Sequence, residues 1–140
     1  SGSWVDGGPP VFSGLVAQPT RFSLAEAGAI VSRTETDAGD LADLQDLVGS
    51  TRPVGSVAYK LLRVAAGADA LTYSIRPKSE WDICGGVGLL LAAGHVYLRL
   101  DGAPLLFNRA DTRIPCGAVA GPEPLALALR RRLIARTFKR

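Results

Sequence analysis

Short apolar runs alternate along this chain with longer patterns at helical spacing, and most of the longer patterns stop at a glycine. Leu41, Leu44 and Leu47 recur at such a spacing before a glycine, whereas the run 71–75 alternates apolar and polar residues as a strand does. Helices are expected over about 41–48, 56–65, 81–93 and 123–137, and strands over 11–17, 22–27, 30–32, 71–75, 96–100, 105–107 and 117–120. Helices and strands that alternate without internal repeats predict an α/β protein, a mixed α/β layered sandwich.

The length of the chain limits it to one domain. At 140 residues with 47% hydrophobic content it can bury a substantial core, and it is too short for two domains. We assign residues 4–140 to a single α/β domain and interpret residues 1–3 as a cloning scar or a cut end, because they do not begin a secretory signal. Arg63, Arg76 and Arg99 interrupt the apolar runs, so none approaches the roughly 20 residues of a membrane helix. No membrane association is expected.

The cysteine content indicates a reducing compartment. The chain has two cysteines, Cys84 and Cys116, each in apolar surroundings. Buried free thiols are expected rather than a disulfide. Free thiols persist in the cytoplasm, so a cytoplasmic location is predicted.

The formal net charge of +3 comes largely from a basic cluster near the C-terminus. Its members are Arg130, Arg131, Arg132, Arg136, Lys139 and Arg140. The cluster is either a patch for nucleic acid or the solvated face of a terminal helix, where cations complement the helix dipole. No aromatic residues interleave with the arginines as stacking platforms for bases. We therefore expect the helix, and no nucleic-acid polymer as a partner.

Asp82 lies at the expected start of the helix over 81–93. A carboxylate there is held close to backbone N–H groups, and Trp81 is expected to anchor the turn in the core. This position suits a hard divalent cation such as Mg²⁺, which takes oxygen ligands. It also suits simple helix capping, which the residues alone favour.

Gly55, Ser56 and Lys60 surround the start of the helix over 56–65. The glycine allows close backbone approach, the serine and the helix N-terminus offer donors, and the lysine could place an ammonium beside a phosphate oxygen. These features together predict an anion cradle. The alternative is a serine N-cap followed by a solvated lysine.

His95 follows the expected helix over 81–93. It has no accompanying nucleophile or acid of a catalytic triad, so it is interpreted as a structural or surface histidine.

Three motifs follow one another in a distinctive order: Gly-Ser-Val-Ala-Tyr-Lys at 55–60, Ser-Glu-Trp-Asp at 79–82 and Leu-Asp-Gly-Ala-Pro-Leu at 100–105. In this order they resemble the C-terminal part of the inositol monophosphatase superfamily, and within it the 3'(2'),5'-bisphosphate nucleotidases of the CysQ type. The run Ser-Arg-Thr at 32–34 is similar to a family motif that faces the same cleft. The resemblance implies the family's α/β fold, a Mg²⁺ cofactor and Asp82 as a metal ligand. The residues that it implies for substrate binding are Ser32, Arg33, Gly55, Ser56 and Lys60.

The family's N-terminal metal-binding elements, a Glu and an Asp-Pro-Ile/Leu-Asp-Gly-Thr run, have no counterpart in the chain. A two-metal site needs several oxygen ligands, so no complete catalytic set is expected. The resemblance implies part of a Mg²⁺-dependent phosphatase acting on a small phosphorylated metabolite, adenosine 3',5'-bisphosphate or an inositol phosphate. The alternative is a catalytically degenerate domain that binds a ligand or a partner protein. Both predict an exposed apolar face and self-association through it.

Gly85 and Gly86 depart from the small, alanine-rich residues that the family has after the aspartate. Two glycines weaken a helix in its first turns. They also allow another element to approach closely, and the sequence leaves both interpretations open.

Overall fold

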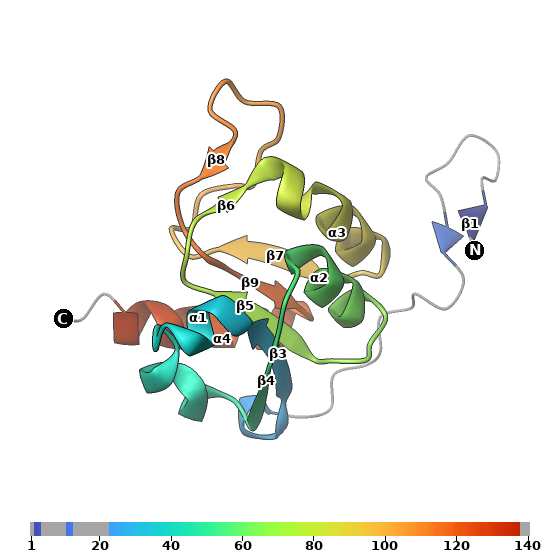
Figure 1. Ribbon diagram of the computed structural model, residues 1–140. Helices are drawn as coiled ribbons and strands as arrows, with labels where there is room; N and C mark the ends of the chain where they lie inside the picture. The colour runs from blue at the N-terminus through green and yellow to red at the C-terminus, as the bar shows by residue number, and fades with distance from the viewer. Residues whose placement is uncertain (1, 4–10, 13–22, 138–140) are drawn as a thin grey trace.

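The computed structural model describes residues 2–3, 11–12 and 23–137, and its centre is a five-stranded mixed sheet (Figure 1). The strands of this sheet are β3 (Gly28–Ser32), β4 (Ser50–Val54), β5 (Leu71–Ser74), β7 (Val96–Arg99) and β9 (Ala118–Gly121), in the order β4-β3-β5-β9-β7. Two short pairs lie outside it, β1 (Gly2–Ser3) with β2 (Val11–Phe12) and β6 (Lys78–Ser79) with β8 (Arg113–Ile114). The predicted α/β fold class is confirmed.

Three neighbouring strands of the sheet point the same way. Strand β3 runs parallel to both β4 and β5, whereas β9 runs antiparallel to β5 and β7. The carboxyl ends of β3, β4 and β5 therefore lie at one edge of the sheet. Ligands of open α/β sheets bind outside the carboxyl ends of the strands, which makes this edge the first place to look for a site.

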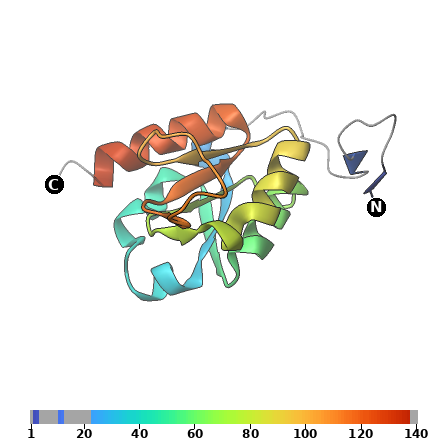
Figure 2. The same cartoon turned by 90° about the horizontal axis from the view of Figure 1, so that it is seen from above.

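Helices cover both faces of this sheet (Figure 2). Helices α2 (Val57–Ala65) and α3 (Glu80–Ala92) pack against one face, and α4 (Glu123–Thr137) packs against the other with the 3-10 helices η1 (Leu24–Glu26) and η2 (Ala42–Leu47). The short helix α1 (Arg33–Asp37) follows β3 directly. Within the described residues, every helix is too short or too polar to cross a membrane.

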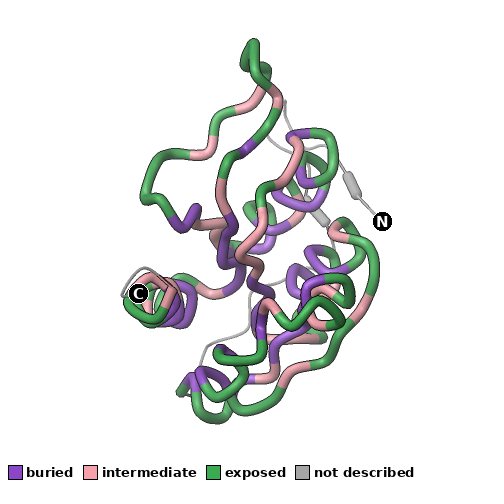
Figure 3. The backbone as a smooth tube through the Cα atoms, turned by 60° about the vertical axis from the view of Figure 1, so that its left-hand side comes forward, coloured by how far each residue is buried: buried purple, intermediate pink, exposed green. Residues whose placement is uncertain are grey.

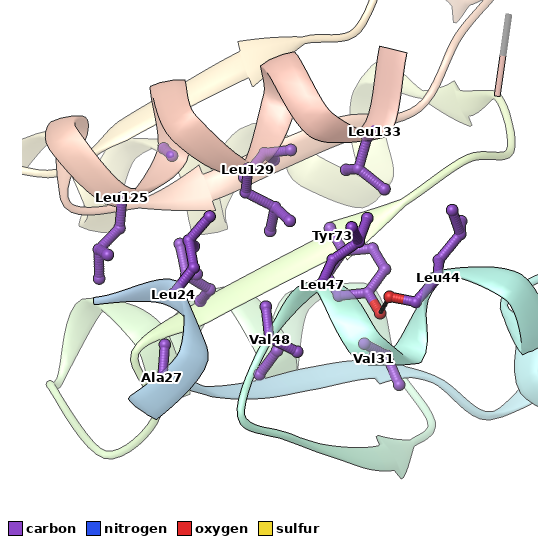
Figure 4. Packing of buried hydrophobic residues seen from close by; sticks show 14 of the residues in the cluster. Leu24, Ala27, Val31, Leu44, Leu47, Val48, Tyr73, Leu125, Leu129 and Leu133 are labelled. Atoms are coloured by element: carbon purple, nitrogen blue, oxygen red, sulfur yellow. Dashed lines mark hydrogen bonds between the residues drawn. The ribbon is translucent and has the colours of Figure 1, made fainter. Parts of the chain in front are cut away.

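Leucines at every fourth position of α4 form the centre of one core (Figure 4). Leu125, Leu129 and Leu133 are buried, because a spacing of four keeps them on one side of the helix. Tyr73 of β5 lies among them, and its hydroxyl donates to the Leu44 carbonyl at 3.5 Å. Burial raises the pKa of Tyr73 to about 12. The helix predicted over 123–137 is thus confirmed.

The second core depends on a close contact between α2 and α3. Leu61 of α2 packs among buried residues of α3 and the sheet, including Ile83 and Ile30. A Cβ placed on Gly86 would lie 2.6 Å from the Cβ of Leu61, whereas one on Gly85 would meet nothing within 4 Å. Close approach of another element is therefore confirmed as the reason for a glycine at position 86, and Gly85 faces outward.

The segment expected as a helix over 41–48 is the 3-10 helix η2. Leu41, Leu44 and Leu47 are all buried. They recur every three residues, which matches the three residues per turn of a 3-10 helix better than the 3.6 of an α-helix. The helix predicted over 41–48 is therefore present, as a 3-10 helix.

Two predicted strands are wrong. The segment 22–27 contains η1, whose Leu-Ala-Glu sequence consists of good helix formers. The segment 105–107 has no strand partner and belongs to the largely exposed loop over 101–112, which projects from the body of the protein (Figure 3). Of the strand predicted over 11–17, Val11–Phe12 forms β2 and the remainder lies outside the described residues.

Trp81 does not anchor the start of α3, because its side chain is 70% exposed. Glu80 is buried instead; its backbone N–H donates to the Thr112 carbonyl at 2.9 Å, and its carboxylate accepts from the Arg109 N–H at 3.4 Å. The loop that precedes β8 thus holds the helix start. Cys84 is also exposed, which corrects the prediction that it is buried, although both cysteines are free as expected.

His95, the single histidine of the chain, is buried. Its Nδ1 has no hydrogen-bond partner among the described residues, and burial lowers the pKa of its imidazole. The unfolded chain therefore binds the proton more readily as the pH falls through about 6.5, and the folded state loses stability in acid.

We expect the urea midpoint of the protein to fall as the pH is lowered from about 7 to about 5. The variant His95→Gln, which cannot titrate, should lose less over the same range. Equal losses in the two proteins would show that His95 does not cause the acid sensitivity.

Candidate functional site

A cavity of about 40 Å³ lies at the sheet edge where the parallel strands β3 and β5 end. It has room for about three water molecules. Helix α2 and strands β6, β7 and β9 complete its walls. Its polar lining residues include Ser32, Glu35, Lys60, Thr72, Ser74 and Lys78.

Glu35 is the buried carboxylate of this cavity, with a residue exposure of 1%. It lies in α1, immediately after β3, and reaches across to the end of β5. Its Oε2 accepts from the Ser74 hydroxyl at 2.7 Å, and its Oε1 accepts from the backbone N–H groups of Ile75 and Arg76 at 2.8 and 3.3 Å. The Glu35 carboxylate therefore ties the ends of two parallel strands together.

Lys60 of α2 is buried at 6% exposure, so it is not the solvated lysine of the alternative interpretation. Its Nζ donates to the carbonyls of Val54 and Ser56 at 3.2 and 3.1 Å. Burial lowers the pKa of Lys60, the ammonium of Lys78 lowers it further, and the Glu35 carboxylate opposes both effects. The ammonium is held by neutral carbonyls beside a second positive charge.

Lys78 is a second ammonium of the cavity, and it was not among the residues predicted from the sequence. Its Nζ donates to the Ser74 hydroxyl at 2.7 Å and to the Arg76 carbonyl at 3.2 Å, and lies 3.8 Å from the Glu35 carboxylate. Burial lowers the pKa of Lys78, while Glu35 opposes this shift. No local pattern marks Lys78, because only the pairing of β6 with β8 brings it here.

The remaining predicted substrate residues lie at the same sheet edge but differ in their contacts. Ser32 lines the cavity and caps α1, its Oγ accepting from the Glu35 N–H at 3.2 Å. Arg33 and Gly55 are exposed and do not line the cavity. Ser56 caps α2 through the Tyr59 N–H at 3.2 Å.

The turn before α2 carries backbone strain at Ser56 rather than at Gly55. Ser56 has a φ of 66°, in the left-handed region that a serine rarely adopts. Such strain costs about 1–3 kcal/mol and is common at binding sites. The N-cap bond and the bond from Lys60 to the Ser56 carbonyl hold this conformation.

Asp82 is exposed in the first turn of α3 and lines a separate hollow of about 320 Å³ together with Lys78, Trp81 and Arg113. Over residues 23–137, no group of three His, Cys, Asp or Glu side chains is placed to hold a metal ion. Asp82 can thus supply one oxygen ligand, but the described residues do not form a complete Mg²⁺ site.

The charges around the cavity favour an anionic ligand. Lys60 and Lys78 both line it, and the Glu35 carboxylate acts on both of their charges. Lysine ammonium groups bind phosphate oxygens through charge-assisted hydrogen bonds. The arrangement can bind an oxyanion at the sheet edge, beside the hollow that contains the Asp82 carboxylate.

Comparison with known proteins identifies a family and several relatives. The family model described as the inositol monophosphatase family matches residues 2–135. The 3'-phosphoadenosine 5'-phosphate phosphatase of Mycobacterium tuberculosis is 31% identical over 139 residues, which covers 84% of this chain and 52% of the relative. The chain therefore spans about half the length of the curated relatives that it matches.

Solved structures give the same result. The inositol monophosphatase of Anabaena superimposes with a TM-score of 0.66 and 26% identity, over 85% of this chain and 47% of that one. The extragenic suppressor protein SuhB of Bartonella henselae superimposes with a TM-score of 0.65 and 21% identity, over 84% of this chain and 46% of that one. At 21% identity, the likeness to SuhB shows a shared fold alone.

Proposed function

Because the chain belongs to the inositol monophosphatase family, we propose that it forms part of a Mg²⁺-dependent phosphatase that hydrolyses a phosphate monoester of a small metabolite. The observation that carries the proposal is the cavity with Lys60 and Lys78 on its wall, next to the hollow that contains Asp82. A phosphate bound there has ammonium groups on one side and a potential metal ligand on the other. Adenosine 3',5'-bisphosphate is the substrate that we propose first, because it is the compound named in the mycobacterial relatives.

The proposed roles follow from the position of each side chain. Lys60 binds phosphate oxygens, and the cap serines Ser32 and Ser56 contribute hydroxyl and backbone contacts at the same edge. Arg33 and Gly55 contact the parts of the substrate that extend outside the cavity. Asp82 contributes one oxygen ligand to Mg²⁺, which would supply Lewis-acid chemistry when bound. Free cysteines agree with the cytoplasmic location that we propose.

A second candidate is a catalytically degenerate domain that binds a phosphorylated ligand or a partner protein without turnover. It is favoured by one specific observation, that residues 23–137 contain no three-residue metal-ligand cluster. A two-metal hydrolytic site needs more oxygen ligands than Asp82 alone. For a phosphorylated ligand, the two candidates differ in whether phosphate is released.

We test the first candidate by measuring phosphate release from adenosine 3',5'-bisphosphate and from inositol monophosphate, with and without Mg²⁺. Mg²⁺-dependent release should fall by at least about 100-fold in Asp82→Asn. Loss of a group that only orients a metal ligand already lowers activity by about 10–100-fold, and loss of the ligand itself should cost at least as much. Glu123→Gln is the matched control, since Glu123 is an acid in the first turn of α4 on the opposite face of the sheet. Binding without release is expected of the chain both as a partial site and as the degenerate domain, whereas Mg²⁺-dependent release would rule the degenerate domain out.

Self-association through an apolar face is a further part of the proposal. Tyr59 and Leu62 on α2 and Trp81 and Leu91 on α3 are all at least 43% exposed. Sedimentation velocity should therefore show dimers or larger species as the concentration rises, and Leu91→Lys should shift the protein toward monomer. A monomer at every concentration would rule this association out.

A further inference from the structure

We propose that Lys78 is a substrate-binding residue that donates to a phosphate group lying between the cavity and the Asp82 hollow. This inference rests on the proposed function, since it names a further contact in the same site. Lys78 is the residue that lines both spaces, with Lys60 on the cavity side and Asp82 on the hollow side. A phosphate that binds where the two spaces meet is therefore within reach of the Lys78 ammonium.

The tertiary structure places Lys78 at this junction. Strand β6 pairs with β8 through Lys78 and Ile114, and the Glu80 N–H bond to the Thr112 carbonyl fixes the following residues. The Lys78 side chain is 15% exposed. It is thus mostly buried but still reachable from the hollow, as a group that binds a small anion must be.

The hydrogen bonds of Lys78 leave capacity for a ligand. An ammonium has three donors, and within the described part of the chain two of them go to neutral oxygens, those of Ser74 and Arg76. The Glu35 carboxylate lies at 3.8 Å, beyond hydrogen-bond distance. Glu35 therefore balances charge without occupying the third donor.

The charge balance around the cavity also favours a bound anion. Glu35 is the carboxylate that acts on both Lys60 and Lys78, and the Lys78 ammonium depresses the pKa of Lys60. Two ammonium groups that share one carboxylate leave a net positive charge in a low-dielectric site, and an anion bound beside Lys78 offsets this charge. An anion with several charges gains more than one with a single charge.

The experiment measures pyrophosphate binding to the chain by calorimetry at low salt without Mg²⁺, so that it does not depend on turnover. Lys78→Gln should weaken binding at least about tenfold, which is the effect of losing a charge-assisted hydrogen bond, and Lys78→Arg should restore most of it. Arg132→Gln, which removes an exposed cation from α4 on the other face, should change the affinity less than about twofold. Urea midpoints check that each variant is folded.

Pyrophosphate binding that is absent, or equal in the unaltered chain and Lys78→Gln, overturns the inference. If Lys78→Gln does not fold, ¹³Cε-lysine NMR of the unaltered chain replaces it. A Lys78 resonance that shifts on pyrophosphate addition supports the contact, and one that stays in place overturns it. Phosphate release from adenosine 3',5'-bisphosphate is measured in parallel, because absent release with Lys78-dependent binding leaves the contact standing, whereas absent binding overturns it.

Discussion

Glu35→Ala should destabilise the protein by about 3 kcal/mol, because removing one partner of a buried charged network leaves the others unpaired. The Ser74 hydroxyl and the N–H groups of Ile75 and Arg76 would lose their acceptor inside the protein. The Lys78 ammonium, 3.8 Å away, would lose its compensating charge. Chemical denaturation should show a much lower midpoint at an unchanged slope.

The control for this prediction is Asp37→Ala, which removes an exposed acid from the same short helix. Its effect should stay within about 0.5 kcal/mol, as is usual for surface positions. Glu35→Gln should lie between the two, since it keeps the volume and one acceptor oxygen but loses the charge. If Glu35→Ala and Asp37→Ala unfold at the same denaturant concentration, the Glu35 network does not stabilise the fold.

Gly86→Ala and Gly85→Ala should have effects of opposite sign although the two glycines are adjacent. A Cβ at position 86 would approach the Leu61 Cβ to 2.6 Å, so α2 and α3 would have to separate. Such overpacking costs about 1–3 kcal/mol, which exceeds the gain of about 1 kcal/mol from replacing a helical glycine. At position 85 nothing lies within 4 Å, and only the gain remains.

We therefore expect thermal melting to rise for Gly85→Ala and to fall for Gly86→Ala. Gly88→Ala serves as a second control, because that glycine of α3 also has open space around it. Stabilisation by all three substitutions would mean that α2 and α3 do not pack closely at Gly86. The comparison separates helix propensity from packing in one helix.

Sequence periodicity predicted helices and strands well where the pattern was long or where the predicted strand pairs with a neighbouring strand of the sheet. Helices α2, α3 and α4 and strands β3, β5, β7 and β9 were expected within a few residues of their bounds. The leucine spacing predicted a helix over 41–48, and the structure has the 3-10 helix η2 there. The strand predicted over 105–107 does not form. Its residues are apolar, but no neighbouring strand among the described residues pairs with them.

The site was predictable only as far as its residues lie next to strand and helix ends in the sequence. Lys60 was named from its place one turn into α2, beside Gly55 and Ser56, and Ser32 at the end of β3 was named from the family resemblance. Glu35 and Lys78 belong to no motif or spacing that singled them out in the sequence. Their burial follows from contacts between segments about 40 residues apart along the chain, as in the bond from the Ile75 N–H to Glu35.

The sequence by itself determined the alternation of helices and strands, the buried stripe of α4 and the family motifs, because these depend on local spacing and residue type. Tertiary structure alone decided which polar side chains share one cavity. Three parallel strands end at one edge, and the β6–β8 pairing delivers Lys78 there, opposite Glu35 and Lys60. Charge interactions in a buried site depend on distances through space, and these are not encoded in the spacing of residues along the chain.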